Sequence, residues 1–289
     1  MKKAVPFLIL SLLVLSCGGR KNTDKKSSKE TLNFSITELW STDTIMKTPE
    51  SVLYDSVRKV LYVANMNRID GGDNTGFITK MDTDGTVIDL HWIDGLYEPR
   101  GMGIYENRLF ATDMDRIIVI DIEKGELVKS IPVEGAVFLN DLAIDKEGTV
   151  YFSDSRAGKL QYYKDGEIID WFPEYPNPNG LLDAGENIIV CATSSKEIRR
   201  VNKTTGEYEV IATGINGDGI EHSGIQDYYI VTEWEGRMHL INNDTIQTVL
   251  DSSKEKINSA DIGYHLDKKI IYVPTFFDNR VVAYTLNKK

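Results

Sequence analysis

Four residues with oxygen-bearing side chains recur at the same place in successive repeats of this chain. They are Glu50, Asn140, Asn179 and Asp218, and each stands at the turn before a short apolar strand. Two carboxylates and two amides form an all-oxygen set, which suits Ca²⁺ because this ion takes about six to eight hard oxygen ligands. A zinc site would need His or Cys, and no histidine stands at such a position. The sequence therefore predicts a site for Ca²⁺ or another divalent cation.

The repeats that carry these residues have a period near forty residues. Equivalent positions are Glu50, Arg100, Asn140, Asn179, Asp218 and Ala260, with spacings of 50, 40, 39, 39 and 42. Each repeat continues as short strands rich in Val, Ile, Tyr and Phe, many of them bounded by Asp-Gly or Glu-Gly turns. A period of this length, built from hairpin-sized strands, is typical of a β-propeller. We therefore expect an all-β fold, a six-bladed β-propeller with little helix.

Strand boundaries follow from two of the repeats. The second repeat predicts strands at 101–105, 108–112, 116–121 and 126–131. The third predicts strands at 141–144, 149–153, 159–163 and 167–171. The sixth repeat has room for only three strands, whereas residues 34–45 form a spare strand. We expect this N-terminal strand to complete the last blade, because closing the ring removes an exposed sheet edge.

The inner strands of a propeller all start at one end of its central channel. The four oxygen-bearing residues, one from each of four blades, are therefore expected to converge at the channel mouth. The alternative is that each side chain only caps the turn that begins its strand, which is common for Asn and Asp. That alternative explains any one position more easily than it explains all four.

Three segments of the chain resemble a known group of propellers. Residues 139–154 (LNDLAIDKEGTVYFSD) resemble the third-blade signature of the senescence-marker-protein/gluconolactonase superfamily, and residues 178–181 (PNGL) and 217–220 (GDGI) are similar to its next two. This superfamily also includes paraoxonases, diisopropyl fluorophosphatase and strictosidine-synthase-like proteins. The resemblance implies that Glu50, Asn140, Asn179 and Asp218 bind calcium and that Asp218 is also the catalytic general base or nucleophile. The metal would then polarise a lactone, ester or phosphoryl oxygen.

Three further residues are candidates for substrate binding. Arg100 stands where gluconolactonases carry a substrate-binding arginine and paraoxonases carry a histidine, but the asparagine that gluconolactonases have two positions later is Met102 here. A guanidinium there could hold an anionic or hydroxylated substrate, or serve as a structural counter-ion for Glu50 or Asp218. Glu233 and Trp234 follow the second strand of the fifth repeat, where they would contact a ligand at the mouth or simply belong to a solvated loop.

The N-terminus carries the features of an export signal. Lys2 and Lys3 precede an apolar run, 4–15, that is too short to span a bilayer. The run ends in Val-Leu-Ser before Cys17, which resembles a bacterial lipobox, and position 18 is not Asp. We expect a signal peptide at 1–16, a lipidated Cys17 with a flexible tether at 17–33, and the propeller at 34–289. The location would be the bacterial cell envelope, lipid-anchored at the outer membrane and facing the periplasm. An ordinary cleaved signal, with Cys17 incidental, is the alternative.

Charge and composition limit the partners. The net charge of −11 argues against nucleic acid and against an anionic membrane surface as the main partner. Contact with a membrane is expected only through the lipid on Cys17, and a small-molecule substrate is the expected partner. The expected function is a calcium-dependent hydrolase of the lactonase or esterase type that acts on a small lactone or ester. The alternative is a non-catalytic lipoprotein whose propeller binds a ligand or partner and holds a structural metal ion.

Overall fold

The computed structural model describes Met1, residues 33–68 and residues 74–289. Residues 2–16 of the predicted signal peptide, Cys17 and the predicted tether up to residue 32 lie outside the described residues. From Phe34 onward the chain forms six four-stranded antiparallel sheets, which confirms the predicted all-β, six-bladed β-propeller. The helical content of the described part is a single 3₁₀ turn, η1 (Phe276–Asp278). None of the described segments is a helix long and apolar enough to cross a bilayer.

In blades one to five the four strands are arranged in sequence order, with the first strand nearest the channel and the fourth outermost. Blades one and two contain β2 (Pro49–Asp55), β3 (Val60–Asn65), β4 (Gly76–Asp82), β5 (Val87–Leu96), then β6 (Pro99–Tyr105), β7 (Arg108–Asp113), β8 (Arg116–Asp121) and β9 (Glu126–Pro132). Blades three and four contain β10 (Leu139–Ile144), β11 (Val150–Asp154), β12 (Lys159–Lys164), β13 (Glu167–Phe172), then β14 (Pro178–Ala184), β15 (Asn187–Ala192), β16 (Glu197–Asn202) and β17 (Tyr208–Thr213). Blade five contains β18 (Gly217–His222), β19 (Tyr229–Glu233), β20 (Arg237–Asn242) and β21 (Thr245–Asp251). The strands predicted in the second and third repeats agree with these bounds to within two residues.

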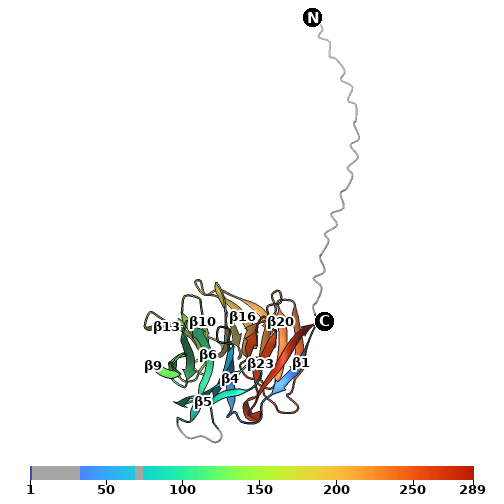
Figure 1. The fold of residues 1–289 in the computed structure, drawn as a ribbon. Helices are drawn as coiled ribbons and strands as arrows, with labels where there is room; N and C mark the ends of the chain where they lie inside the picture. The colour runs from blue at the N-terminus through green and yellow to red at the C-terminus, as the bar shows by residue number, and fades with distance from the viewer. Residues whose placement is uncertain (2–32, 69–73) are drawn as a thin grey trace. The chain divides into compact units, whose positions relative to one another are not determined.

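Blade six is assembled from both ends of the propeller sequence. Its strands are β22 (Gly263–His265), β23 (Ile270–Pro274), β24 (Val281–Lys288) and, on the outside, β1 (Phe34–Ser41). β1 pairs antiparallel with β24 from Phe34 opposite Lys288 to Ser41 opposite Val282. In Figure 1 the blue β1 accordingly lies beside the red strands of the chain end. The predicted closure by an N-terminal strand is confirmed.

The apolar core lies between the blades. Each of six large clusters of buried side chains joins two neighbouring blades; one, for example, packs Tyr62 and Ile78 of blade one against Leu109 and Ile118 of blade two. The strands near the channel are covered on both faces, so the second strand β3 is buried along its whole length, whereas the outermost strand β9 is mostly exposed. Burial of one such aliphatic side chain contributes about 1.5–3 kcal/mol. This packing fixes the inner strands relative to one another.

Candidate metal centre

We call the six equivalent repeat positions, Glu50, Arg100, Asn140, Asn179, Asp218 and Ala260, the ring positions. A β-bulge interrupts the first strand of blades one to five at its ring position. In blade two, Pro99 pairs with Asp113 and Met102 pairs with Ala111, so Arg100 and Gly101 face a single residue of β7. Register shifts at the corresponding place occur in the other four, at Pro49/Ser51, Leu139/Leu142, Pro178/Leu181 and Gly217/Ile220. A bulge takes a residue out of the regular pairing and turns its side chain. These bulges hold Glu50, Arg100, Asn140, Asn179 and Asp218.

The bulged segments of neighbouring blades approach one another closely. A Cβ atom added to Gly180 would lie 2.0 Å from the backbone oxygen of Asp218, and one added to Gly101 would lie 2.2 Å from Oδ1 of Asp141. Only glycine fits at such distances. The ring residue that precedes each glycine therefore sits directly beside the next blade.

The two asparagines use their amide nitrogens within the protein. Nδ2 of Asn179 donates to Oδ1 of Asp218 at 2.6 Å. Nδ2 of Asn140 donates to Oγ of Ser155 at 3.0 Å, and that hydroxyl donates to the carbonyl of Pro178 at 2.6 Å. These bonds fix both amide groups and leave the oxygen as the atom of each amide that is suited to a cation.

Glu50 is a buried carboxylate without a full set of partners. It is 7% exposed, and its Oε2 atom is buried with no hydrogen-bond partner. Burial raises the pKa of Glu50 well above its usual value, and the negative charges of Asp218 and Asp261 raise it further. Arg100 acts in the opposite direction on this pKa, but it forms no ion pair with Glu50 among the described contacts. An unpaired buried carboxylate is costly unless a cation or proton neutralises it.

Three further carboxylates lie near the channel: Asp141 in β10, Glu221 in β18 and Asp261 in the segment before β22. Asp141 accepts hydrogen bonds from the backbone amides of Leu142 and Leu181, and Asp261 accepts one from Oγ of Ser51 at 2.9 Å. Both line a channel cavity of about 180 Å³, together with Glu221. These three residues were not predicted from the sequence, although Asp141 directly follows Asn140 and Asp261 directly follows Ala260 in their repeats.

The acidic residues of the channel share a raised affinity for protons. Desolvation by burial is the main cause, and it raises the pKa of Asp218 and of Asp261 to about 7 and that of Glu221 to about 8. The charge of Asp261 adds to the shift of both Asp218 and Glu221. Within this part of the protein, negative charge is therefore undercompensated.

These observations fit a hard divalent cation at the mouth. The described residues include no cluster of three or more His, Cys, Asp or Glu side chains placed to hold a metal ion. The predicted set differs from such a cluster because amide oxygens supply half of its ligands. The set has two carboxylates and two fixed amide oxygens, which are donor types that Ca²⁺ accepts, and Oε2 of Glu50 is buried without a hydrogen-bond partner.

Arg100 is held mainly by groups other than the two carboxylates considered for it. Its side chain is 1% exposed; Nη2 pairs with Oε2 of Glu98 at 2.5 Å, and Nη1 donates to the carbonyl of Leu139 at 3.0 Å. Its guanidinium lies 4.0 Å from the ring centroid of Phe138, and its Nε atom is buried without a partner. Glu98, two residues before Arg100, is thus its counter-ion.

Glu233 and Trp234 are adjacent in sequence but lie in different surroundings. Glu233 is 5% exposed, and its carboxylate accepts hydrogen bonds from the amide of Asn216 and from Arg237, with His239 Nε2 at 3.2 Å. It therefore holds the loop between blades four and five. Trp234 is 39% exposed and contacts Phe276 and Phe277 edge-on. Trp234 is the one of the two that a ligand can reach.

The position of Glu233 has equivalents in two other blades. Asp113, at the end of β7, accepts hydrogen bonds from the amides of Tyr97 and Glu98, and Asp154, at the end of β11, accepts them from Val137 and Phe138. An acidic residue at the end of the second strand thus caps the incoming connection.

Comparisons with known proteins support the fold alone. No protein-family model matches the chain, and no curated protein matches it. A crystal structure of catalytically inactive virginiamycin B lyase from Staphylococcus aureus with quinupristin is similar, with a TM-score of 0.62, 14% identity, and 88% of this chain and 99% of that chain covered. The nidogen/laminin complex contains a chain with a TM-score of 0.63 and 18% identity, with 75% and 84% covered.

Proposed function

We propose that this protein is a calcium-dependent hydrolase of the lactonase or esterase type, which acts on a small lactone or ester at the channel mouth. The observation that carries the proposal is the oxygen set Glu50, Asn140, Asn179 and Asp218, in which all but the partly exposed Asn179 are buried. One carboxylate atom of the set is unpartnered, and both carboxyl pKa values are raised. The resemblance of segments 139–154, 178–181 and 217–220 to the gluconolactonase superfamily supports the same assignment.

The residues of the set would divide two tasks between them. Glu50, Asn140 and Asn179 would hold the ion together with one oxygen of Asp218, and the bound ion would supply positive charge to polarise the substrate carbonyl. Asp218 would accept a proton from the water that attacks the carbonyl carbon. As the bond between that carbon and the leaving oxygen breaks, the proton passes to the leaving alkoxide. The hydrogen bond from Asn179 to Asp218 keeps the carboxylate oriented during this transfer.

Trp234 and Arg100 would act differently on a substrate. Trp234 offers an exposed aromatic surface beside Phe277 for an apolar group. Arg100 is enclosed by Glu98 and Phe138, so its contribution would come through its unpartnered Nε atom or through the charge it places near Glu50. Glu233 already has three partners and would support the loop that carries Trp234.

Hydrolysis of a substrate panel tests this proposal. Aldonolactones, acyl-homoserine lactones and aryl esters are assayed with calcium, manganese or zinc and with a chelator. We expect metal-dependent turnover that falls at least about 100-fold in Glu50→Gln, because a charged ligand is lost. Glu147→Gln is the matched control, since Glu147 lies exposed in a turn between β10 and β11. Turnover that survives in Glu50→Gln, or that ignores the chelator, would refute the metal centre as the catalyst.

A binding propeller without turnover is the second candidate. The closed environment of Arg100 and Glu233 favours it, because both predicted substrate contacts already have protein partners. Metal-dependent stabilisation without hydrolysis of any substrate in the panel would favour this candidate.

The N-terminal sequence adds a proposal on location. We propose that Cys17 is lipidated and anchors the protein in the bacterial cell envelope, at the outer membrane facing the periplasm. Incorporation of labelled palmitate should be lost in Cys17→Ser and retained in Cys191→Ser, because Cys191 is buried within the propeller. Equal labelling of both variants would contradict the anchor.

A further inference from the structure

Ser155 links the ring positions of blades three and four through its side chain. It follows β11, and its Oγ atom accepts a hydrogen bond from Nδ2 of Asn140 at 3.0 Å and donates one to the backbone carbonyl of Pro178 at 2.6 Å. Pro178 directly precedes Asn179, which occupies the ring position of blade four. One hydroxyl group therefore joins the amide of Asn140 to the backbone beside the next ring position.

The backbone of Ser155 is held independently of this hydroxyl. Its amide donates to the carbonyl of Phe138 at 3.0 Å, and the neighbouring Asp154 accepts hydrogen bonds from the amides of Val137 and Phe138. Removal of the hydroxyl alone should therefore leave the path of the connection before Asn140 unchanged.

The chain of hydrogen bonds through Ser155 has a fixed direction. A backbone carbonyl can only accept, so the single proton of the Ser155 hydroxyl must point to Pro178. The hydroxyl then presents lone pairs to Asn140, and only the NH₂ group of that amide can donate to them. The opposite orientation would place Oδ1 of Asn140 against an oxygen atom with no proton between them. Ser155 thereby engages Nδ2 and leaves Oδ1 free, since none of the described residues donates a hydrogen bond to it.

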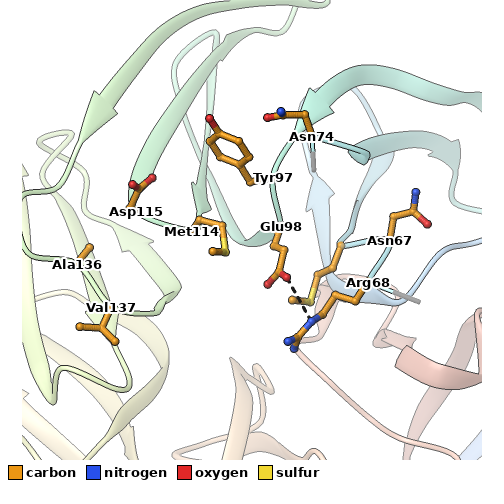
Figure 2. A pocket seen from close by; sticks show the side chains of 10 residues that line it. Asn67, Arg68, Asn74, Tyr97, Glu98, Met114, Asp115, Ala136 and Val137 are labelled. Atoms are coloured by element: carbon orange, nitrogen blue, oxygen red, sulfur yellow. Dashed lines mark ion pairs between the residues drawn. The ribbon is translucent and has the colours of Figure 1, made fainter. Parts of the chain in front are cut away.

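The residue that corresponds to Ser155 in the other blades varies with the ring position. It follows the residue that pairs with the start of the first strand, and in blades one to five it is Met66, Met114, Ser155, Thr193 and Trp234. Among these five blades, a hydroxyl group thus occurs in the two whose ring position is an asparagine. In blade two, where the ring position is Arg100, the apolar side chain of Met114 lines a pocket instead (Figure 2).

The asparagine of blade four is fixed in another way. Nδ2 of Asn179 donates to Oδ1 of Asp218, and the Thr193 hydroxyl donates to the carbonyl of Asn177. Among the described contacts the side-chain nitrogen of Asn140 has no carboxylate partner, so the orientation of this amide depends on Ser155.

We propose that Ser155 is a positioning residue for the metal centre, which orients the amide of Asn140 so that Oδ1 is the atom offered to the cation. The inference rests on the metal centre of the proposed function, and it assigns Ser155 to the support of a ligand and not to the ligand set. Without the hydroxyl, both orientations of the Asn140 amide become accessible, and the ligand oxygen is offered in only part of the molecules. Removal of a group that orients a metal ligand commonly weakens metal binding by about 10–100-fold.

Calorimetric titration with calcium tests this role without turnover. We expect the Kd of calcium to rise about tenfold in Ser155→Ala. Ser223→Ala is the matched control, because it also removes a hydroxyl that donates to a backbone carbonyl, that of Tyr228 at 2.6 Å. Ser223 follows the end of β18 opposite to Asp218, so this variant should keep the Kd of the wild type. An unchanged Kd in Ser155→Ala would overturn the proposal.

A second background distinguishes orientation of the amide from a general effect on the loop. In Asn140→Asp both side-chain oxygens can bind a cation, so the orientation of the group no longer matters. Ser155→Ala should therefore raise the Kd by less than about twofold in the Asn140→Asp background. A rise of about tenfold in both backgrounds would mean that the hydroxyl acts through the structure of the loop, which would overturn the assigned role.

Ester hydrolysis separates this inference from the proposed function. If calcium binding depends on Ser155 as expected but no lactone or ester of the panel is hydrolysed, the positioning role stands and the hydrolase function fails. If calcium-dependent hydrolysis occurs and Ser155→Ala keeps the Kd of the wild type, the positioning role fails and the function stands. A wild-type protein that binds neither calcium nor manganese would overturn both.

Discussion

Two neighbouring ring positions, occupied by Glu50 and Arg100, place opposite charges on equivalent bulges. Both side chains are buried, and each has one polar atom without a partner. The difference lies in the residues around them. Arg100 has a counter-ion two residues away in Glu98, whereas Glu50 meets further carboxylates, and its pKa is raised. The same backbone feature therefore holds an uncompensated carboxylate in blade one and an arginine with a counter-ion in blade two.

The largest expected effect is the pH dependence of stability without metal. The pKa values of Asp218 and Asp261 are raised to about 7, so the folded protein binds more protons than the unfolded chain between pH 4 and 7. The contribution of these two carboxyl groups to the free energy of unfolding is therefore largest below about pH 4 and falls as the pH rises to 7, by about 1.4 kcal/mol per pH unit for each extra proton. Chemical denaturation with a chelator at several pH values measures this slope, and saturating calcium should flatten it. A slope of the opposite sign would contradict the conclusion that the negative charge of the channel carboxylates is undercompensated.

Removal of the Glu98 carboxylate should destabilise the protein, because Glu98 pairs with both Arg68 and Arg100. Glu98→Gln leaves Arg68 and Arg100 without their shared carboxylate, and Arg100 cannot reach water. We expect a loss of about 1–3 kcal/mol, less than for a fully buried pair because Glu98 is partly exposed. Urea denaturation at pH 7.5 measures this loss, and Glu123→Gln, at an exposed ion pair with Arg58, is the matched control. No difference between the two variants would show that Glu98 does not compensate Arg100.

The matching substitution at Glu50 should change the free energy of unfolding in the opposite direction to Glu98→Gln. At pH 7.5 without metal, Glu50→Gln removes a buried carboxylate that lacks a partner, and we expect a gain of about 1 kcal/mol in the free energy of unfolding. The same variant should lose most of the stabilisation that calcium gives to the wild type. A destabilised Glu50→Gln protein in the presence of chelator would mean that Glu50 already has its charge compensated.

The smallest expected effect concerns Trp234, which contacts Phe276 and Phe277. Trp234→Ala should lower the free energy of unfolding by no more than about 1 kcal/mol, because the side chain is partly exposed although it packs edge-on against Phe276 and Phe277. KM for esters with a bulky apolar group should rise several-fold, and KM for small esters should stay the same. Tyr208→Ala, at an exposed aromatic residue of β17, is the control. An equal rise for both ester types would exclude a specific contact with the apolar group.

Much of the architecture could be predicted from the sequence because the repeats are local. Each strand is bounded by its own turn, and the spare segment beginning at Phe34 had only one free edge to pair with. The ring positions could be predicted for the same reason, since each occupies the same place in its repeat.

The hydrogen-bond partners of the residues at the ring positions could not be predicted from the sequence. The partner of Asp218 is Asn179 in the neighbouring blade, and Asn140 is fixed through Ser155 and Pro178. Such contacts depend on how far each bulge turns its side chain, and periodicity carries no information on this. The role of Glu233 as a cap could have been inferred, because Asp113 and Asp154 occupy the same place in their blades.

Anomalous diffraction from a crystal soaked in Mn²⁺ tests the metal centre most directly. We expect one strong peak at the channel mouth, within about 2.5 Å of a carboxylate oxygen of Glu50, a carboxylate oxygen of Asp218 and the amide oxygens of Asn140 and Asn179. The peak should disappear in Asp218→Ala. A peak bound by other residues, or no peak at the channel mouth at saturating Mn²⁺, would contradict a metal centre formed by these four residues.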